Sequence, residues 1–303
     1  MLHSSVTPQE KRRLLRQRLE ENRPLVLLGA FNALSARMIE QAGADAVYLS
    51  GHMIAADLGL PDLGLTTATE VAYRANQVSR MIDVPLIVDA DTGFGEPLNT
   101  ARSIQTLEDA GVAGCHIEDQ VNPKQCGHSE GIQVVSRQLA LQRISAAVAA
   151  RRDPNFLIIA RTDSRSAVGL DEAIARGKAF RDAGADVVFA EALSGPDEVA
   201  RFRDEVSAPL MVNLNEFGSH EPLTIDQVKN LGIAIAIYPM TLTRLAMGAV
   251  QRGIETILAN GSQLSLLPDM QTKDELYDLL GYADYHAFDN GVFGLSAEGS
   301  DTQ

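Results

Sequence analysis

The sequence predicts a (β/α)8 barrel, and two interleaved patterns along the chain lead to this prediction. In the first pattern, a glycine at the end of a helix precedes an apolar run, as in QAGADAVYLSG. Glycine suits the left-handed residue that closes a helix before a turn into a strand. In the second pattern, proline introduces an apolar run, as in PLIVDADTG, and proline is tolerated at the start of a strand but not in its middle. The glycines are Gly43, Gly111, Gly184 and Gly232, and the prolines are Pro24, Pro85, Pro154 and Pro209.

The two patterns alternate and predict eight strands near residues 25–31, 46–50, 86–91, 114–119, 157–162, 187–192, 210–215 and 234–238. These runs are almost continuously apolar, as parallel strands covered by helices require. Helical stretches lie between them, and one opens with the capping box Thr67-x-x-Glu70. Eightfold alternation of strand and helix favours a closed barrel over an open doubly wound sheet. The first strand also lacks the Gly-x-Gly-x-x-Gly turn of dinucleotide-binding sheets.

The domain organisation expected from these elements is a single domain over residues 1–303. The barrel should occupy about 24–260, with a helical extension over about 261–295. An N-terminal helix should precede the barrel, because Thr7, Pro8 and Glu10 form a capping box with proline in the first turn. The segment from about Leu267 to Phe293 is rich in apolar residues although no strand remains to be covered.

Composition excludes several classes of protein. The net charge is −14, from 40 acidic residues against 26 Lys and Arg, which disfavours a nucleic-acid partner. Two cysteines among 303 residues, and no long apolar run, predict a cytoplasmic protein that is neither secreted nor bound in a membrane. An anionic substrate would need local cations or a metal to overcome this negative field.

Acidic side chains gather where the predicted strands end, the position of active sites in barrels. Asp89 and Asp91 are two residues apart, so on a strand both carboxylates face the same side and repel unless a cation lies between them. Oxygen ligands predict Mg²⁺, with Mn²⁺ as a substitute. Asp62 and Glu118 are candidates for outer positions around this metal. The alternative is that these acids cap helices or pair with Arg161.

Two cysteine pairs raise the question of a zinc site. Neither Cys115-His116 nor Cys126-x-His128 has the spacing of paired structural zinc ligands, so Cys115 is interpreted as a small core residue. Cys126 differs, because it lies in KQCGHSEG shortly after the acidic end of strand four. Flanking glycines give this loop freedom, and Lys124 and His128 would favour a thiolate. A catalytic thiol and a surface cysteine both remain open at this point.

Several long motifs resemble the isocitrate lyase and phosphoenolpyruvate mutase superfamily, and among its members the methylisocitrate lyases. They occur in the expected order over nearly the whole chain: YLSG at 48–51, LPDLGLTT at 60–67, VDADTGFG at 88–95, HIEDQ with KQCGH at 116–128, ARTD at 160–163, NEFG at 215–218, YPMT at 238–241 and DMQTKDELYDLLGY at 269–282.

The resemblance implies a lyase that cleaves 2-methylisocitrate to pyruvate and succinate in propionate breakdown. It implies Mg²⁺ at Asp89 and Asp91, with Asp62 and Glu118 reaching the metal through water. It also implies that Cys126 protonates the succinate carbanion from a loop that closes over the substrate, with Lys124 and His128 beside the thiol. The implied substrate contacts are Ser50, Gly51, Gly127, Arg161, Glu191, Asn213, Leu214 and Arg244. Exchange of C-terminal helices in a homotetramer is implied as well; the alternative is a helix folded back on its own barrel.

Three positions depart from the family pattern. His52 replaces a small residue, Asn215 replaces threonine, and Lys273 replaces arginine, all at positions that correspond to substrate contacts. A related 2-hydroxy acid such as 2,3-dimethylmalate or isocitrate is therefore an alternative substrate. Decarboxylation or hydrolysis of oxaloacetate is an alternative reaction, and a barrel that only binds an anionic metabolite is the alternative without catalysis.

Overall fold

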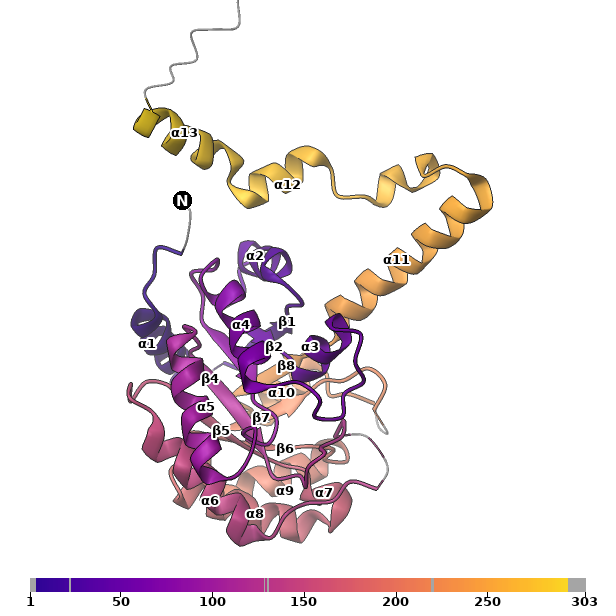
Figure 1. Ribbon diagram of the computed structural model, residues 1–303. Helices are drawn as coiled ribbons and strands as arrows, with labels where there is room; N and C mark the ends of the chain where they lie inside the picture. The colour runs from indigo at the N-terminus through magenta and orange to yellow at the C-terminus, as the bar shows by residue number, and fades with distance from the viewer. Residues whose placement is uncertain (1–3, 22, 128, 130, 219–220, 294–303) are drawn as a thin grey trace, which may run out of the picture. The chain divides into compact units, whose positions relative to one another are not determined.

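The fold is a closed barrel of eight parallel strands (Figure 1). The computed structural model describes residues 4–21, 23–127, 129, 131–218 and 221–293. Each strand pairs with the next in sequence, and β8 closes the barrel on β1 with Leu25 opposite Ile235. The (β/α)8 prediction is confirmed. The strands are β1 Leu25–Gly29, β2 Val47–Leu49, β3 Leu86–Asp89, β4 Gly114–Glu118, β5 Leu157–Thr162, β6 Val187–Ala190, β7 Leu210–Asn213 and β8 Ile235–Tyr238.

Helices surround the strands, as Figure 1 shows. They are α1 Pro8–Leu19, α2 Ala33–Gln41, α3 Gly51–Asp57, α4 Ala68–Ser79, α5 Pro97–Asp109, α6 Arg137–Ala150, α7 Ser164–Ala167, α8 Leu170–Asp182, α9 Gly195–Val206 and α10 Ile225–Asn230. Helix α11 Thr241–Asn260, the 3-10 helix η1 Leu264–Asp269 and helices α12 Lys273–Leu280 and α13 Tyr282–Phe293 follow in the chain. The predicted capping boxes open α1 at Thr7 and α4 at Thr67.

Glycines end the helices as the sequence predicts. Gly43, Gly111, Gly184 and Gly232 all have positive φ, between 64° and 94°. Several strands end earlier than expected, however: β3 stops at Asp89 rather than at residue 91, and β7 stops at Asn213 rather than at 215. The physical reason in β3 is local, because Asp91 adopts a left-handed conformation with φ 46° and cannot continue the strand.

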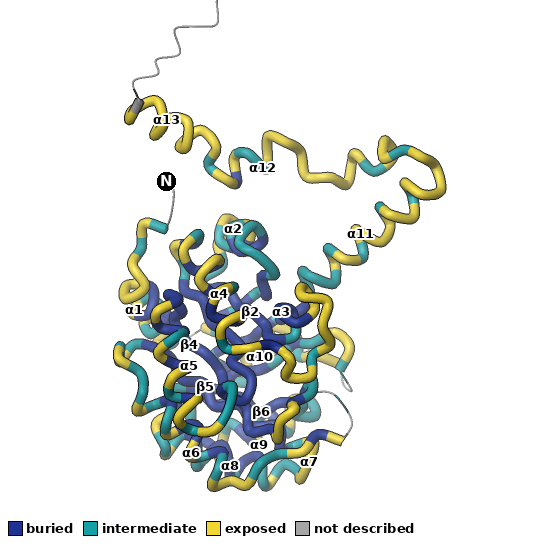
Figure 2. Tube along the Cα trace, in the orientation of Figure 1, coloured by how far each residue is buried: buried dark blue, intermediate teal, exposed yellow. Residues whose placement is uncertain are grey.

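Alternation along the strands divides the core into an inner and an outer layer. Leu25 and Leu27 point into the barrel interior, where they join Ile159 and Phe189. Residues of the opposite parity, such as Val88, pack against the surrounding helices. Buried residues accordingly follow the strands in Figure 2. Each strand keeps this alternation to its end. The residue two positions after the last inward-facing apolar residue therefore also points inward, even when it is polar.

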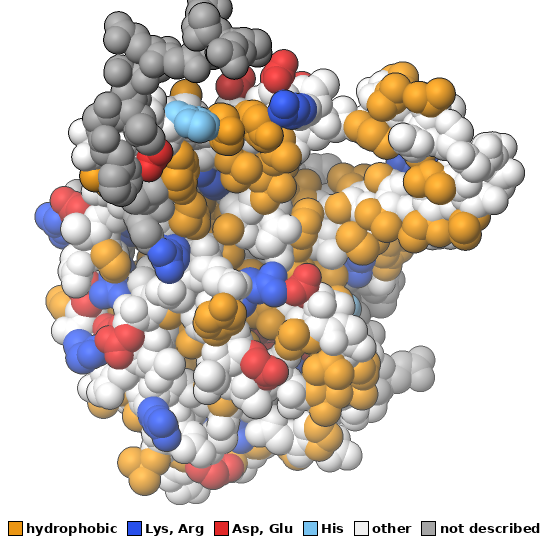
Figure 3. Space-filling view, turned by 45° about the horizontal axis from the view of Figure 1, so that its top comes forward, with side chains coloured by type: hydrophobic (Ala, Val, Ile, Leu, Met, Phe, Trp, Pro, Cys, Tyr) orange, Lys and Arg blue, Asp and Glu red, His pale blue; other side chains and the backbone are white. Residues whose placement is uncertain are grey.

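The chain divides into two compact units, Val6–Arg244 and a second formed by Met1–Ser5 with Leu245–Gln303. The first unit contains all eight strands. In the second, the Tyr277 and Tyr282 rings stack 4.4 Å apart. Hydrophobic side chains gather along the part of the chain that contains α11 (Figure 3), among them Val250, Ile254 and Leu258. No helix in the described residues is long and apolar enough to cross a membrane.

Candidate active site

Polar side chains from six strands meet at the carboxyl end of the barrel. Each follows an inward-facing residue by two positions, so strand alternation directs it into the same space. The six are Ser50, Asp89, Glu118, Arg161, Glu191 and Asn213, and the inner residues before them are Tyr48, Ile87, His116, Ile159, Phe189 and Met211. One cavity is lined by five of the six, and Glu118 contacts Arg161 beside it.

Loops after the strands add the remaining polar groups of this cavity. His52 and Asp62 follow β2, while Lys124, Cys126 and Gly127 follow β4. Asn215 follows β7, and Arg244 lies in the first turn of α11. The structure thus brings together most of the residues that the sequence singled out.

The carboxylates of Asp89 and Asp91 converge on Gly51. A Cβ atom on Gly51 would lie 3.0 Å from Asp89 Oδ2 and 3.0 Å from Asp91 Oδ1, and the Gly51 N–H donates to Asp89 Oδ2 at 3.1 Å. Burial would raise the pKa of Asp89, but His116, Lys124 and Arg161 lower it to about 2. Burial and the charge of Asp89 raise the pKa of Asp91 to about 6. The two acids therefore share a strongly negative, buried position.

Lys124 supplies the cation nearest to this pair. Its Nζ lies 2.5 Å from Asp62 Oδ1 and 2.8 Å from Asp91 Oδ1, and its side chain is only 4% exposed. Burial alone would lower the pKa of Lys124, but the surrounding carboxylates, chiefly Glu118 and Asp89, raise it instead. Lys124 is therefore a permanently charged ammonium whose contacts go to carboxylates.

Two buried oxygens suit a metal ion. Among the described side chains, Asp91 Oδ1 and Glu118 Oε1 are buried without a hydrogen-bond partner, although Asp91 Oδ1 pairs with Lys124. Burial raises the pKa of Glu118 well above its usual value despite the opposing charge of Arg161. A divalent cation would stabilise the ionised forms of both acids, and their hard oxygen donors fit Mg²⁺ or Mn²⁺.

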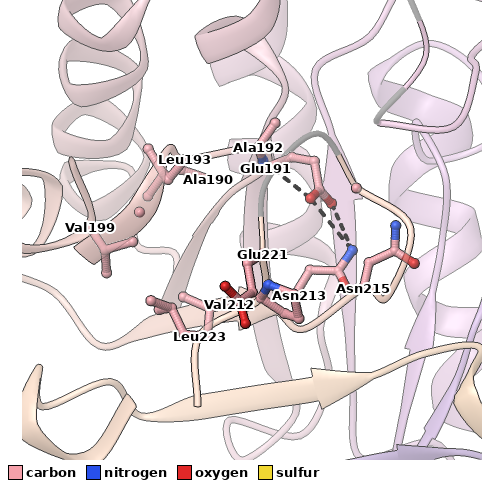
Figure 4. A pocket seen from close by; sticks show the side chains of 13 residues that line it. Ala190, Glu191, Ala192, Leu193, Val199, Val212, Asn213, Asn215, Glu221 and Leu223 are labelled. Atoms are coloured by element: carbon pink, nitrogen blue, oxygen red, sulfur yellow. Dashed lines mark hydrogen bonds between the residues drawn. The ribbon is translucent and has the colours of Figure 1, made fainter. Parts of the chain in front are cut away.

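Arg161 is held by three carboxylates. Its Nε and Nη2 donate to the two oxygens of Asp163 at 3.0 and 2.8 Å. Glu118 Oε2 lies 3.3 Å from Nε, and Glu191 Oε2 lies 3.3 Å from Nη1. Glu191 also accepts from the amide of Asn213 at 3.3 Å, and Figure 4 shows these two side chains pointing toward one another. The alternative that acids pair with Arg161 thus holds for Glu118.

Gly127 packs directly on this arginine network. A Cβ atom at Gly127 would clash with Arg161 Nη2 and would lie 2.6 Å from Glu191 Cγ and 2.7 Å from Asp163 Oδ1. Only a residue without a side chain lets the loop approach this closely. Cys126 is therefore held at the mouth of the cavity by its neighbour, and neither cysteine of the chain forms a disulfide.

Arg244 also lines the cavity. Its Nη1 donates to Asn215 Oδ1 at 2.9 Å and pairs with Glu216, and its guanidinium lies 4.9 Å from the centre of the Phe217 ring. Asn215, one of the three departures from the family pattern, thus positions an arginine that faces the cavity.

Not every predicted site residue lines this cavity with its side chain. Asp91 and Glu118 lie beside it, where Asp91 pairs with Lys124 and Glu118 with Arg161. The side chain of Leu214 faces away from the barrel interior and packs with Val212 and Ala236, so only its backbone is available to the site. Lys273 belongs to the C-terminal unit, where its Nζ lies 5.1 Å from the centre of the Tyr277 ring. His128 lies outside the described residues.

The sequence reasoning missed the floor of the cavity. Tyr48 hydroxyl and His116 Nε2 are 2.7 Å apart, and His116 lies 3.5 Å from Asp89 Oδ1. Burial lowers the pKa of His116 to about 4, so its ring is neutral, and burial raises the pKa of Tyr48. Strand parity could have found both, because each precedes an inward polar residue by two positions. Cys115 is fully buried in the outer layer, as expected.

Comparison with known proteins places this site in a family. The model of that family, phosphoenolpyruvate phosphomutase, matches residues 15–258. The chain belongs to the phosphoenolpyruvate phosphomutase family. A family member from Corynebacterium glutamicum, named probable 2-methylisocitrate lyase 2, is 49% identical over 98% of this chain and 97% of its own length.

Solved structures in the family share the whole fold. An oxaloacetate acetylhydrolase with the inhibitor 3,3-difluorooxalacetate has a TM-score of 0.90 at 34% identity and covers 96% of this chain and 99% of its own. A 2,3-dimethylmalate lyase has a TM-score of 0.88 at 33% identity, with coverages of 98% and 99%. A phosphonopyruvate hydrolase in complex with oxalate and Mg²⁺ has a TM-score of 0.83 at 28% identity, with coverages of 91% and 97%. The predicted superfamily and the carbon–carbon lyase class are confirmed.

Proposed function

We propose that this chain is a Mg²⁺-dependent lyase that cleaves 2-methylisocitrate to pyruvate and succinate. The observation that carries the proposal is the placement of Cys126 and Gly127 over a cavity that also contains Asp89, Lys124 and Arg161. A buried acidic cluster, cations for carboxylates and a thiol at the mouth are the groups that this cleavage requires. The name of the Corynebacterium glutamicum relative supports the choice of substrate.

A divalent metal follows from the charge balance of the cavity. Among the described residues at the cavity, six carboxylates surround two buried cations, Lys124 and Arg161, so an anionic substrate would meet net repulsion. The carboxylates are Asp62, Asp89, Asp91, Glu118, Asp163 and Glu191. We propose Asp89 and Asp91 as the metal-holding residues, with Glu118 and Asp62 in outer positions. When bound, Mg²⁺ would act as a Lewis acid on the hydroxyl oxygen of the fragment that becomes pyruvate.

The residues of the chain supply binding and the proton. Arg161 and Arg244 face the cavity and would hold substrate carboxylates by their planar guanidinium groups. Cleavage breaks one carbon–carbon bond, and the hydroxyl proton passes to solvent as the carbonyl of pyruvate forms. The bonding electrons remain on the succinate carbon, which takes the thiol proton of Cys126. Solvent then returns a proton to the sulfur before the next cycle.

The close contact of Gly127 with Arg161 and Glu191 has a consequence for this step. A loop seated there limits access of water to the cavity, and a carbanion formed inside is protonated by the thiol rather than by solvent. Gly127 also brings a backbone N–H to the same position, where it could donate to a substrate oxygen.

The test supplies four substrates with Mg²⁺ and measures the product acids: 2-methylisocitrate, isocitrate, 2,3-dimethylmalate and oxaloacetate. We expect the protein to release pyruvate and succinate from 2-methylisocitrate at a rate well above its rates with the other three substrates. Failure to cleave 2-methylisocitrate under any condition would refute the substrate. Cys126→Ser is expected to abolish turnover while leaving Mg²⁺ binding intact, whereas Cys115→Ala, which alters the buried cysteine, should remain active.

A second candidate is a lyase for a smaller 2-hydroxy acid such as 2,3-dimethylmalate. The observation in its favour is that two of the departures from the family pattern, His52 and Asn215, line the cavity. The 2,3-dimethylmalate lyase with a TM-score of 0.88 shows that the shared fold accommodates such a substrate. The relative rates in the same assay separate the two candidates.

We further propose a homotetramer that works in the cytoplasm, with C-terminal helices exchanged between neighbours, and a single domain over residues 1–303. Val250, Ile254 and Leu258 on α11 are between 49% and 81% exposed, and a neighbouring copy of the chain would cover them. Two cysteines without a disulfide suit a reducing compartment. The mass of the protein in solution tests the assembly.

A further inference from the structure

A second group of metal ligands lies at the mouth of the cavity, apart from the acidic pair. One ligand atom each from His52, Asp62 and Cys126 lies within 4.8 Å of the other two. We propose that these three residues form a site for a borderline-soft transition metal such as Zn²⁺. A nitrogen, an oxygen and a sulfur donor make the set that Zn²⁺ prefers, whereas Mg²⁺ prefers oxygen alone.

The geometry is close to that of a tetrahedral site. His52 Nδ1 and Asp62 Oδ2 are 3.6 Å apart, and usual Zn–N and Zn–O bond lengths place two tetrahedral ligands about 3.4 Å apart. The thiolate would lie about 3.6 Å from each of them. Cys126 Sγ lies at most 4.8 Å from each, so it must move inward by about 1.3 Å at most. A side-chain rotation on a loop supplies this movement. The fourth position remains for water.

The two metal sites are separated by Lys124. Asp62 presents Oδ1 to the Lys124 ammonium at 2.5 Å and Oδ2 to His52 at 3.6 Å, so one oxygen can bind Zn²⁺ while the other keeps its ion pair. Asp91 lies on the other side of the ammonium, 2.8 Å from Nζ. The residues that bind the hard and the soft cation directly thus differ, and the ion pair with Lys124 holds Asp62 in place for the second site.

Access favours capture of the metal from solution. The His52 side chain is 38% exposed, and all three residues are partly buried rather than enclosed. Binding forms bonds from the metal to Cys126 Sγ, His52 Nδ1 and Asp62 Oδ2. The thiol proton leaves to solvent, the imidazole binds as a neutral ligand, and no group is oxidised or reduced.

A metal ion at this site would inhibit the reaction by binding the sulfur of Cys126. This consequence rests on the proposed function, because a metal-bound sulfur carries no proton for the succinate carbanion. Zn²⁺ should therefore abolish cleavage in proportion to its occupancy, and a chelator should restore it. His52 therefore gives this chain an inhibitory metal site. A small residue at position 52 would not supply the nitrogen ligand.

The test uses Co²⁺ as a spectroscopic probe of the full chain, with excess Mg²⁺ to fill the acidic pair. We expect one equivalent of Co²⁺ to produce a thiolate-to-cobalt charge-transfer band, and His52→Ala and Cys126→Ser each to remove it. Cys115→Ala should retain the band. Absence of the band in the wild type, or its persistence in His52→Ala, would overturn the proposal. No substrate is present, so failure of the proposed lyase function would leave this result unchanged.

Alkylation of Cys126, followed by mass spectrometry, gives a second measurement. Zn²⁺ at ten times its dissociation constant should slow the reaction about tenfold, because only about a tenth of the thiol remains unbound. His52→Gln should lose this protection and should fold normally, since the side chain is partly exposed. Equal protection in wild type and His52→Gln would contradict the assignment of His52 as a ligand.

Discussion

Gly127→Ala is expected to disable the loop without changing any chemical group of the site. The added Cβ atom would clash with Arg161 Nη2 and would lie 2.6 Å from Glu191 Cγ, where ordinary contact begins at 3.4 Å. Arg161 is fixed by both oxygens of Asp163, so the loop must retreat by at least about 0.8 Å. Overpacking of this kind costs about 1–3 kcal/mol, which corresponds to about a 5- to 150-fold loss of the seated loop.

Two assays measure this loss. The rate of 2-methylisocitrate cleavage should fall by that factor, and alkylation of Cys126 should accelerate because the thiol leaves the cavity mouth. Thermal unfolding should change little, since the barrel core is untouched. Ser129→Ala alters the same loop without adding an atom near Arg161 and serves as the matched control. Wild-type cleavage and alkylation rates in Gly127→Ala, or an equal loss in Ser129→Ala, would refute the reasoning.

Three further predictions concern the cations and the assembly. Lys124→Met leaves buried carboxylates unpaired and should lower the free energy of unfolding of the metal-free protein by about 3–5 kcal/mol. Saturating Mg²⁺ should restore this stability. Lys178→Met removes an exposed ion pair and should have little effect on thermal unfolding. The pKa of Asp91 is raised to about 6, so its carboxylate gains a proton as the pH drops below 6. Mn²⁺ affinity measured by calorimetry should fall over the same range. Constant affinity down to pH 5 would contradict this prediction. Leu258→Glu on α11 should lower the mass in solution, whereas Leu98→Glu, equally exposed on α5, should not.

The barrel could be predicted because its signals are local. Helix-closing glycines, strand-opening prolines and capping boxes each depend on neighbouring residues, and every strand was expected within a few residues of its observed position. The positions of Asp89, Glu118 and Arg161 followed for the same reason, since alternation directs them inward at the strand ends. Their roles in the chemistry stay predictions.

Contacts between distant loops could not be predicted in this way. The sequence places Lys124 beside Cys126, yet its ammonium is directed to Asp62 and Asp91, which lie far away along the chain. Asp91 reaches its partner because of a left-handed backbone rather than through strand alternation. Likewise, nothing local to His52 indicates that Cys126 lies within 4.8 Å.

The sequence by itself determined the barrel and the ring of polar residues, because periodicity and turn chemistry act over a few residues. The family followed from the resemblance of its long motifs. Only the tertiary structure decided which charges neutralise one another and how closely Gly127 approaches Arg161. Coulomb energies and steric overlap depend on distances of a few ångströms between loops after different strands, and chain closure around the barrel sets those distances.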